Sequence, residues 1–489
     1  MEEVSVIFDL GKTNKKLLVF NRELNLIQET RVQIPEKTTA DGYLVDDVEA
    51  VEAWMFEALQ QLGRIPNFRI AAINLTTFGA TVAHLDARGH LAMPVFSYAS
   101  PQGDAIHQDY VKWMSALPGG FARHATPPLP QFLNVGKQLY WIQREKPHAK
   151  ENIRSTLFLP QYFLYRLTGR QVADPTSYGC HTGLWDFQTM QPSQIALQAL
   201  EWEQNMPTLV DPTKETFHLT DQCLESFGLE MSPVVGCGLH DSSSALVPYL
   251  VGLQEPFTLV STGTWIIVLN PFARFYLSEE DLQRDRLYYL RPDKKPTRAA
   301  RLFAGREHDI QVQRIKTYFG KTPVPEGDIE PYLQGFISES RFRGLVPEAL
   351  SGSGPFPQCP PGEWDVSGFA TAEEAYARLC LDLAVLTDYC ISEVGTEDGQ
   401  TIIIDGGFAR NPWFVKLIAM LQKPNPVYVA EVPEATALGA ALLIHPHWTQ
   451  KEVSPEHYLK LKKIDAAAVP GLKVYAEHLL SLWEACEPH

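Results

Sequence analysis

The chain has no run of 18 apolar residues and no Cys-x-x-Cys pair among its seven cysteines. The first absence excludes a predicted transmembrane helix. The second, with an odd cysteine count, favours reduced, buried thiols and a cytoplasmic setting over a disulfide framework. A basic leader is also missing, because MEEVSVIFDL is acidic and enters an apolar pattern at once. We therefore expect neither a secretory signal nor a membrane partner.

Positive charge is scarce too. The net charge is −16 and the isoelectric point is near 5.4, which argues against nucleic acid as the partner. A small phosphorylated ligand stays compatible with this balance, because a local site can be positive within an acidic molecule. At 489 residues, 45% of them hydrophobic, the chain is predicted to fold as two globular domains.

The first motif is DLGKTNKKLLVF, Asp9 to Phe20. It is not a Walker P-loop, because Val6 stands where that loop needs a glycine and because an apolar run follows instead of a helix. The pattern predicts strands at Val4–Phe8 and Lys16–Phe20 around a tight turn. Any phosphate bound here would be held by a β-hairpin.

A second stretch repeats this design half a chain away. FTLVSTGTWIIVLN (Phe257–Asn270) is again strand, polar turn and strand, with Gly263 in the turn. We expect glycine in both turns because positive φ and close approach of a phosphate exclude a Cβ. The alternative is two ordinary hairpins.

A third glycine site lies in IIIDGGFARNPWFVKLIAML, from Ile402 to Leu421. A buried strand precedes Asp-Gly-Gly, and a helix is predicted from near Asn411. Gly406 and Gly407 let the backbone lie flat against a ring or a phosphate, and the helix N-terminus favours anions. The alternative is a tight connection between a strand and a helix.

Periodicity and capping residues predict the remaining elements. Helices are expected at about 47–62, over most of 129–168 with Gly169 as its end, at 371–394 and at 435–444. Further strands are expected at 26–34, 70–75, 233–237 and 401–404, and a hairpin at 81–96 turning at Asp86–Gly89.

Together these motifs resemble the FGGY family of carbohydrate kinases over residues 4 to 445. The matching segments are Asp9-Leu10-Gly11 with Thr13 and Lys16, then Ser261-Thr262-Gly263-Thr264, Asp405-Gly406-Gly407 with Ala409 and Asn411, and Glu434–Leu443. The resemblance implies an α/β fold of two actin-like (ribonuclease H-like) domains with a nucleotide and sugar cleft between them. We expect an N-terminal domain over 1–245, a C-terminal domain over 246–450 and a helical extension over 451–489.

The resemblance also implies ATP and Mg²⁺ as cofactors. Asp9 is expected to hold Mg²⁺, which prefers few carboxylates together with phosphate oxygens. The residues expected to bind ATP are Gly11, Lys12, Thr13, Asn14, Lys16, Gly263, Thr264, Gly406, Gly407, Arg410 and Asn411. Lys16 has an alternative role as an exposed strand lysine.

The catalytic candidate lies in GCGLHDSSSALVPY, where Asp241 matches the family's general base. A sugar hydroxyl is a poor nucleophile, so a carboxylate must take its proton as the new bond forms. The alternative is that Asp241 caps a helix beginning at SSSAL. Both roles are compatible, since a cap position also presents a carboxylate.

The residues expected to contact the sugar are Thr77, Phe78, Gly79, Tyr98, Asp174, His240 and Asp241. For several of them a core or turn role is the alternative. Three features depart from the family. Lys12 replaces a Thr or Ser, Gln161 stands where Asp is common, and residues 98–102 (YASPQ) lack the usual Asp-x-Arg after the aromatic. Lys12 could neutralise Asp9, point to solvent or help hold phosphate.

The predicted function is therefore ATP-dependent phosphorylation of a small sugar at a primary hydroxyl. A ketose such as L-rhamnulose, L-fuculose or xylulose is expected, because His240-Asp241 resembles the first two kinase branches and SYGCHTGLWDF the third. The alternatives are a kinase for another polyol or a sugar acid, or a non-catalytic nucleotide- or sugar-binding sensor of the same fold. A homodimer is compatible with all of these.

Overall fold

The computed structural model describes residues 2–338, 344–356 and 359–484. By its contacts the chain divides into two compact units. Unit 1 comprises Met1–Gln254, Tyr288–Pro296 and Pro433–Tyr458, and unit 2 comprises Glu255–Leu287, Thr297–Val432 and Leu459–His489. The segment Pro433–Tyr458 thus packs with unit 1, whereas the sequence suggested a C-terminal domain over 246–450.

Unit 1 is built on a mixed sheet in the order β13-β14-β6-β1-β2-β3, with β15 also paired to β6. The strands are β1 (Glu2–Leu10), β2 (Asn14–Asn21), β3 (Leu26–Gln33), β6 (Phe68–Thr77), β13 (Phe217–His218), β14 (Val234–Val235) and β15 (Leu239–His240). β1 and β2 form the predicted antiparallel hairpin, whereas β6 runs parallel to β1, β14 and β15.

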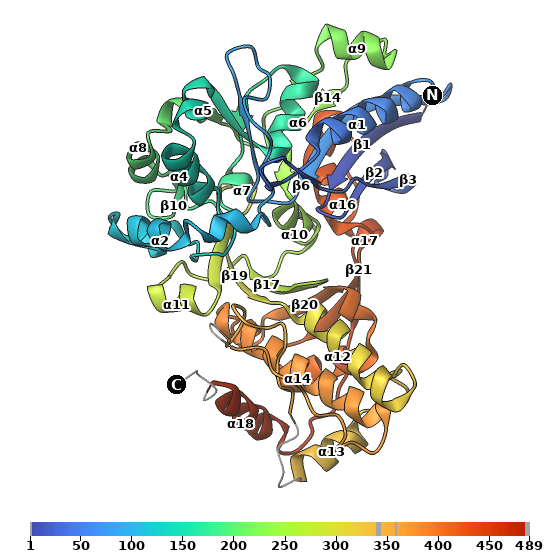
Figure 1. The fold of residues 1–489 in the computed structure, drawn as a ribbon. Coiled ribbons are helices and arrows are strands. Elements are labelled where there is room, and N and C mark those ends of the chain that lie inside the picture. The colour runs from blue at the N-terminus through green and yellow to red at the C-terminus, as the bar shows by residue number, and fades with distance from the viewer. Residues whose placement is uncertain (1, 339–343, 357–358, 485–489) are drawn as a thin grey trace. The chain divides into compact units, whose positions relative to one another are not determined.

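Helix α1 (Val48–Gly63) packs against this sheet (Figure 1). Its Met55 belongs to one apolar cluster with Val6 and Phe8 of β1, and all three side chains are fully buried. Asp47 caps the helix by accepting a hydrogen bond from the Ala50 amide, as its position before the apolar pattern predicted.

Two further helices, α10 (Asp241–Gly252) and α16 (Ala435–Ile444), meet at a glycine. A Cβ on Gly439 would lie 1.9 Å from the Ser244 carbonyl oxygen, and Ser244 Oγ donates to the Thr436 carbonyl at 2.8 Å. The Asn74 amide of β6 donates to the Ala440 carbonyl at 2.9 Å. These backbone approaches explain why the 433–458 segment belongs to unit 1.

Unit 2 holds the second predicted hairpin in a sheet whose consecutive strands are β19, β17, β16, β20, β21 and β22. Their bounds are β16 (Phe257–Thr262), β17 (Ile266–Asn270), β19 (Pro296–Leu302), β20 (Thr401–Gly406), β21 (Val427–Glu431) and β22 (Lys460–Lys463). The hairpin pair β16–β17 is antiparallel, and β20 lies parallel to both β16 and β21.

The core of unit 2 is formed around α14 (Ala372–Glu393), which contacts α12, α13, α15 and α18 (Figure 1). These neighbours are α12 (Ala304–Phe319), α13 (Glu330–Ser338), α15 (Pro412–Leu421) and α18 (Leu472–Glu484). Seventeen residues of α14 are buried, including the ion pair of Arg378 and Asp382. In the part of the chain that the structure describes, no helix is long and apolar enough to cross a membrane.

A strand pairing that the sequence did not predict interrupts one helical stretch. As predicted, most of 129–168 is helical and Gly169 ends it, but α4 (Val135–Glu145) and α5 (Pro147–Asn152) are separated from α6 (Leu159–Thr168) by β8 (Ser155–Phe158). The predicted hairpin turns at Asp86–Gly89 and closes through an antiparallel bridge between Leu85 and Leu91, and β7 (Val82–Leu85) also pairs with β8. Other elements include β4 (Lys37–Thr38), β5 (Leu44–Val45), α2 (His107–Ala116), α7 (Pro175–Tyr178), α9 (Asp221–Phe227), α11 (Glu279–Gln283) and β18 (Arg286–Leu290).

Candidate active site

In unit 1 the carboxyl ends of three parallel strands meet at one edge of the sheet. Asp9 of β1 is opposite Thr76 of β6, and His240 of β15 is opposite Thr77. Ligands of open α/β sheets commonly bind beyond this edge. The register therefore brings together Asp9, Thr77, His240 and the adjacent Asp241, which the sequence had proposed separately.

Asp9 is the most strongly perturbed carboxylate of this edge. Burial raises its pKa to about 7, with further increases from Asp241 and Glu434 and an opposing effect of Lys16. Lys16 is its cross-strand partner in the hairpin and forms an ion pair with Glu434. Asp9 is thus within electrostatic range of two other carboxylates and one ammonium, and a divalent cation bound there would offset the excess negative charge.

The donor set fits Mg²⁺ bound together with phosphate. Among the described residues no group of three His, Cys, Asp or Glu side chains converges to form a metal cage. Mg²⁺ in phosphoryl-transfer sites is usually held by one or two carboxylates, water and phosphate oxygens. Asp9 can serve as such a ligand, and the surrounding negative charge favours the cation.

The two hairpin turns do not need glycine for the reason that the sequence suggested. Neither Gly11 nor Gly263 has a positive φ, whereas Gly406 does, at 91°. A Cβ on Gly263 would meet only the Trp265 carbonyl oxygen, at 3.9 Å. Glycine at this exposed turn therefore leaves open space for a ligand, and the positive-φ expectation is wrong for both hairpins.

Lys12 adopts a fourth arrangement that the sequence did not suggest. Its ammonium donates to Asp46 Oδ1 at 2.7 Å and Ser97 Oγ at 3.0 Å, and pairs with Glu36 Oε1 at 2.7 Å. The same ammonium lies 4.7 Å from the ring centroid of Tyr98. Lys12 thus joins the phosphate hairpin to the residues expected near the sugar.

The neighbouring turn residues Thr13 and Asn14 are exposed. Asn14 Oδ1 accepts a hydrogen bond from Gln33 Nε2 at 3.2 Å, across the β2–β3 pair. The Thr13 hydroxyl and the turn's amides are therefore the groups of this segment best placed to meet a ligand from solvent.

Asp241 is the first residue of α10, and His240 occupies the cap position. The capping alternative is thus displaced by one residue, although Asp241 Oδ1 accepts from the Ser242 amide at 2.6 Å. The helix dipole stabilises a carboxylate at this position. One third of the Asp241 side chain is exposed, so the carboxylate is accessible to a ligand.

His240 connects Asp241 to a buried thiol. Its Nε2 lies 3.1 Å from Asp241 Oδ1 and 3.0 Å from Cys180 Sγ, and its Nδ1 lies 3.3 Å from Ser243 Oγ. Burial opposes the charged imidazolium, but Cys180 and Asp241 outweigh it and raise the pKa of His240 well above its usual value. The sequence indicated His240 but not Cys180.

The other expected sugar contacts divide into two groups. Phe78 and Tyr98 are in edge-to-face contact at 5.8 Å between ring centroids, and a Cβ on Gly79 would lie 2.6 Å from Cys180 Sγ. These residues lie near the group formed by His240, Asp241 and Cys180. Asp174, by contrast, is fully buried and caps α7, where it accepts from the amides of residues 176 and 177.

In unit 2 the parallel strands β16 and β20 also end side by side. Ser261 is opposite Asp405, and Thr262 is opposite Gly406. The Thr262 hydroxyl donates to the Asp405 carbonyl and accepts from the Phe408 amide at 3.0 Å. A Cβ on Gly406 would lie 1.9 Å from the Thr262 carbonyl oxygen, so this glycine is required by the close approach of two backbones.

Helix α12 completes this edge, and the sequence analysis missed it. A Cβ on Gly305 would lie 2.0 Å from the Gly263 carbonyl oxygen, and the Arg306 amide donates to the Thr264 carbonyl at 3.3 Å. The N-terminus of α12 thus supports the turn of the second hairpin. Its apolar periodicity at residues 304–319 was the signal available.

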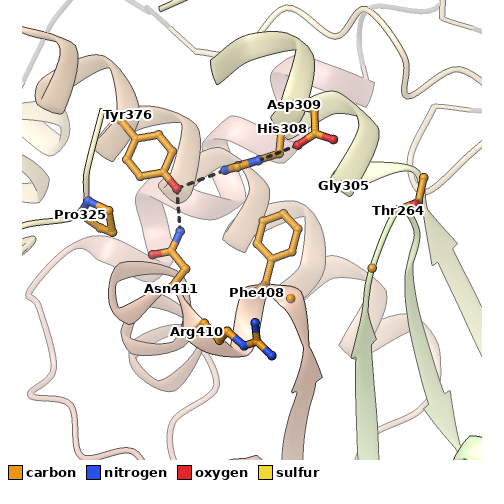
Figure 2. Close-up of a pocket in the computed structure, with 11 residues that line it drawn as sticks. Thr264, Gly305, His308, Asp309, Pro325, Tyr376, Phe408, Arg410 and Asn411 are labelled. Carbon is orange, nitrogen blue, oxygen red and sulfur yellow. Dashed lines mark hydrogen bonds and ion pairs between the residues drawn. The ribbon is translucent and has the colours of Figure 1, made fainter. Parts of the chain in front are cut away.

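A cavity of about 470 Å³ opens beside this turn (Figure 2). It is lined by Gly263, Thr264, Gly305, His308, Asp309, Pro325, Tyr376, Gly407, Phe408, Arg410 and Asn411. Five of these residues were predicted to bind ATP from the sequence, and Gly406 directly adjoins them in the chain. The cavity therefore unites two motifs that are more than 140 positions apart in the sequence.

A hydrogen-bonded chain of side chains forms one wall of the cavity (Figure 2). Tyr376 Oη receives a hydrogen bond from Asn411 Nδ2 at 3.0 Å and lies 3.1 Å from His308 Nε2. Asn411 Oδ1 meanwhile caps α15. Burial lowers the pKa of His308, with a smaller opposing effect of Asp309. Aromatic and amide groups in this arrangement suit a planar, hydrogen-bonding ring.

Two α/β units with matching hairpins and ligand-facing strand ends define the actin-like (ribonuclease H-like) class of folds. Family models agree with this. The model described as "FGGY family of carbohydrate kinases, N-terminal domain" matches residues 4–248, and "Carbohydrate kinase FGGY, C-terminal domain" matches residues 254–452. The chain belongs to the FGGY family of carbohydrate kinases.

Individual relatives are distant. The chain is 25% identical over 280 residues to an L-fuculokinase of Escherichia coli, and 26% identical over 205 residues to a rhamnulokinase of Bacteroides thetaiotaomicron. These matches cover 55% and 41% of the chain and 56% and 40% of the relatives. The chain thus matches about half the length, or less, of these curated relatives.

Similarity in three dimensions extends further. A carbohydrate kinase from Novosphingobium aromaticivorans has a TM-score of 0.82 at 27% identity, with 98% of both chains covered. A xylulose kinase from Lactobacillus acidophilus has a TM-score of 0.78 at 15% identity, covering 98% of this chain and 97% of the other. The second likeness supports the fold alone.

Proposed function

We propose that the chain transfers the γ-phosphoryl group of ATP to a primary hydroxyl of a small sugar, with Asp241 as the general base. The observation that carries this proposal is the exposed Asp241 carboxylate at the N-terminus of α10, on the same sheet edge as Asp9. A ketose such as L-rhamnulose, L-fuculose or xylulose is the proposed acceptor. The names of the fuculokinase and rhamnulokinase relatives support this choice.

The residues have separable roles in the proposed reaction. Asp241 accepts the hydroxyl proton as the oxygen attacks phosphorus, so that the alcohol becomes a competent nucleophile. Asp9 holds Mg²⁺, which neutralises charge on the phosphate oxygens when it is bound. Lys16 lies beside Asp9 and adds positive charge to the same place. The amides around Gly11 and Gly263 are donors for phosphate oxygens.

The cavity of unit 2 is proposed to bind the adenosine part of ATP. Its glycine backbone at Gly407 allows close approach of a planar group, and Asn411 and Tyr376 provide polar groups. This cavity, at about 470 Å³, lies in the range of ligand pockets. In unit 2, backbone amides would bind the phosphate oxygens. The strands of the second hairpin are apolar at the positions where the first hairpin has lysines.

A coupled assay of ADP release against a ketose panel tests the proposal. Asp241→Asn keeps the size of the side chain and removes the base, so kcat should fall by roughly 10²- to 10⁴-fold. Asp221→Asn is a matched control, because Asp221 is likewise the first residue of an exposed helix start, at α9. ADP release that ignores every sugar would contradict the kinase proposal and favour a sensor.

A further inference from the structure

The residues around Lys12 form a charged cluster within unit 1 that the roles above do not use. Lys12 comes from the turn after β1, Glu36 from the segment between β3 and β4, and Asp46 from the residue after β5. Ser97 adds the fourth polar group from the segment that follows β7. We call these four residues the Lys12 cluster.

The ammonium of Lys12 has no hydrogen left for a phosphate. An ammonium carries three N–H donors, and three oxygens lie within 3.0 Å of Lys12 Nζ, one each from Glu36, Asp46 and Ser97. Only 21% of the Lys12 side chain is exposed. A triphosphate would have to displace these partners before it could bind the ammonium.

The two carboxylates, in contrast, keep free acceptor capacity. Glu36 and Asp46 each use one oxygen on Lys12, and Glu36 has a further hydrogen bond with Ser97, while a carboxylate can accept about four hydrogen bonds. Asp46 Oδ2 is buried and accepts no hydrogen bond from the described part of the chain, and its side chain is only 10% exposed. The Glu36 side chain is 30% exposed. The cluster therefore lacks hydrogen-bond donors that a ligand would have to supply.

Aromatic rings link this cluster to the catalytic edge. Lys12 Nζ lies 4.7 Å from the centroid of the Tyr98 ring and 4.9 Å from that of Phe78. Burial raises the pKa of the Tyr98 phenol, and the negative charges of Asp241 and Asp46 both add to this effect. The Tyr98 phenol is thus within electrostatic range of both the proposed base, Asp241, and the Lys12 cluster.

We propose that Glu36 and Asp46, held in place by Lys12, select a neutral acceptor rich in hydroxyl groups and reject an anionic one. This inference rests on the proposed function and names the substrate class of the same site. An acceptor whose reacting hydroxyl meets Asp241 and whose body lies along Tyr98 ends at this cluster. Hydroxyl groups donate to both carboxylates there, whereas a sugar acid presents a third carboxylate and is repelled.

The cluster also explains an apparent loss in the sequence. The charged Asp-x-Arg expected after the aromatic is absent at residues 98–102. Lys12 and Asp46 bring one cation and one anion to the Tyr98 ring from other parts of the chain. The pocket's charges are therefore supplied by different segments and not removed.

Two lysines of one hairpin provide a crossed test. Lys12→Met should raise KM for the ketose at least tenfold and leave KM for ATP within twofold. Lys16→Met should raise KM for ATP at least tenfold and leave KM for the ketose within twofold, because Lys16 lies beside Asp9. Lys37→Met is the control, since Lys37 is mostly exposed and pairs with Asp47 on the surface. A rise in KM for ATP, without one for the ketose, in Lys12→Met would overturn the proposal.

Substrate charge gives the second readout. With ATP, the wild-type protein should use neutral ketoses at least a hundredfold better in kcat/KM than gluconate. Glu36→Gln removes one negative charge and should narrow this ratio at least fivefold. Preference of the wild-type protein for gluconate, or an unchanged ratio in Glu36→Gln, would refute the selection by charge.

Direct binding separates failure of this inference from failure of the proposed function. If no sugar is phosphorylated, the kinase proposal fails, and calorimetric titration with ATP still tests the role of Lys12. Lys12→Met should bind ATP within twofold of wild type. Weaker binding would indicate that Lys12 binds the phosphates of ATP and would contradict this inference. Thermal unfolding of Lys12→Met is measured first. If this variant does not fold, Lys12→Thr takes its place.

Discussion

Gly305→Ala tests the role of α12 in nucleotide binding. The added Cβ would lie 2.0 Å from the Gly263 carbonyl oxygen and 2.8 Å from Thr264 Cα. Ordinary contact begins at 3.4 Å, so the hairpin turn or the helix must move by about 1.4 Å. Both neighbours are backbone, so no flexible side chain can relieve the clash.

The magnitude follows from two opposing terms. Overpacking against rigid structure costs about 1–3 kcal/mol, and Ala gains up to about 1 kcal/mol over Gly in a helix. If the turn yields, the cost appears in binding, and the dissociation constant for ATP should rise by roughly 5- to 150-fold. If the turn at Gly263 and Thr264 keeps its position, the variant should instead have a lower free energy of unfolding than wild type.

Gly335→Ala is the matched control. Gly335 also lies in a helix, α13, and a Cβ there meets no heavy atom within 4 Å. This variant should be as stable as wild type or more stable, with unchanged ATP affinity. Calorimetric titration with ATP and urea unfolding measure both quantities. Gly305→Ala binding ATP within twofold of wild type, at undiminished stability, would refute the account of α12.

Three further predictions concern unit 2. Tyr376→Phe removes the hydroxyl bonded by Asn411, so ATP should bind about 2- to 12-fold more weakly in a titration, as for one lost hydrogen bond. Burial raises the pKa of Asp388 to about 6 from 3.8, so the folded state loses stability as pH rises through that window. Asp388→Asn should therefore raise the free energy of unfolding by about 1–3 kcal/mol at pH 7.5 and by less near pH 5; an equal gain at both values would contradict this. Arg378→Met leaves the buried Asp382 unpaired and should cost about 3–5 kcal/mol in urea unfolding, whereas a loss below 1 kcal/mol would refute the pairing.

Local patterns sufficed wherever an element is specified by its own residues. The α16 bounds, Ala435–Ile444, agree with the sequence prediction, and α14 (Ala372–Glu393) agrees with the helix predicted at 371–394. Both hairpins follow from an apolar run, a polar turn and a second apolar run. These elements form the edges of the candidate site, which is why the family resemblance was visible in the sequence.

The features that the sequence did not reveal share a different cause. Strand β8 lies in a stretch with helical periodicity and exists because it pairs with β7, whose sequence is about 70 residues earlier. Gly305 matters only because a turn about 40 residues earlier packs on it. The partners of Lys12 likewise come from three other segments. No local pattern contains such contacts.

The charge in the first hairpin is arranged by its register. Asp9 is opposite Lys16, and Leu10 is opposite Lys15. Because neighbouring residues point to opposite faces of a sheet, Lys16 meets Asp9, whereas Lys15 turns away and donates to the Lys12 carbonyl at 2.8 Å. A register shift of one residue would place either Lys15 or Leu17 opposite Asp9 in place of Lys16.

The second hairpin has no such charges. Its β17 strand is IIVLN, and Ser261 and Thr262 of β16 are opposite isoleucines. The hairpin of unit 1 therefore carries charged side chains, while the hairpin of unit 2 offers amides beside a cavity. Substitutions at Asp9 or Asp241 should then lower turnover, whereas the backbone change at Gly305 should weaken nucleotide binding.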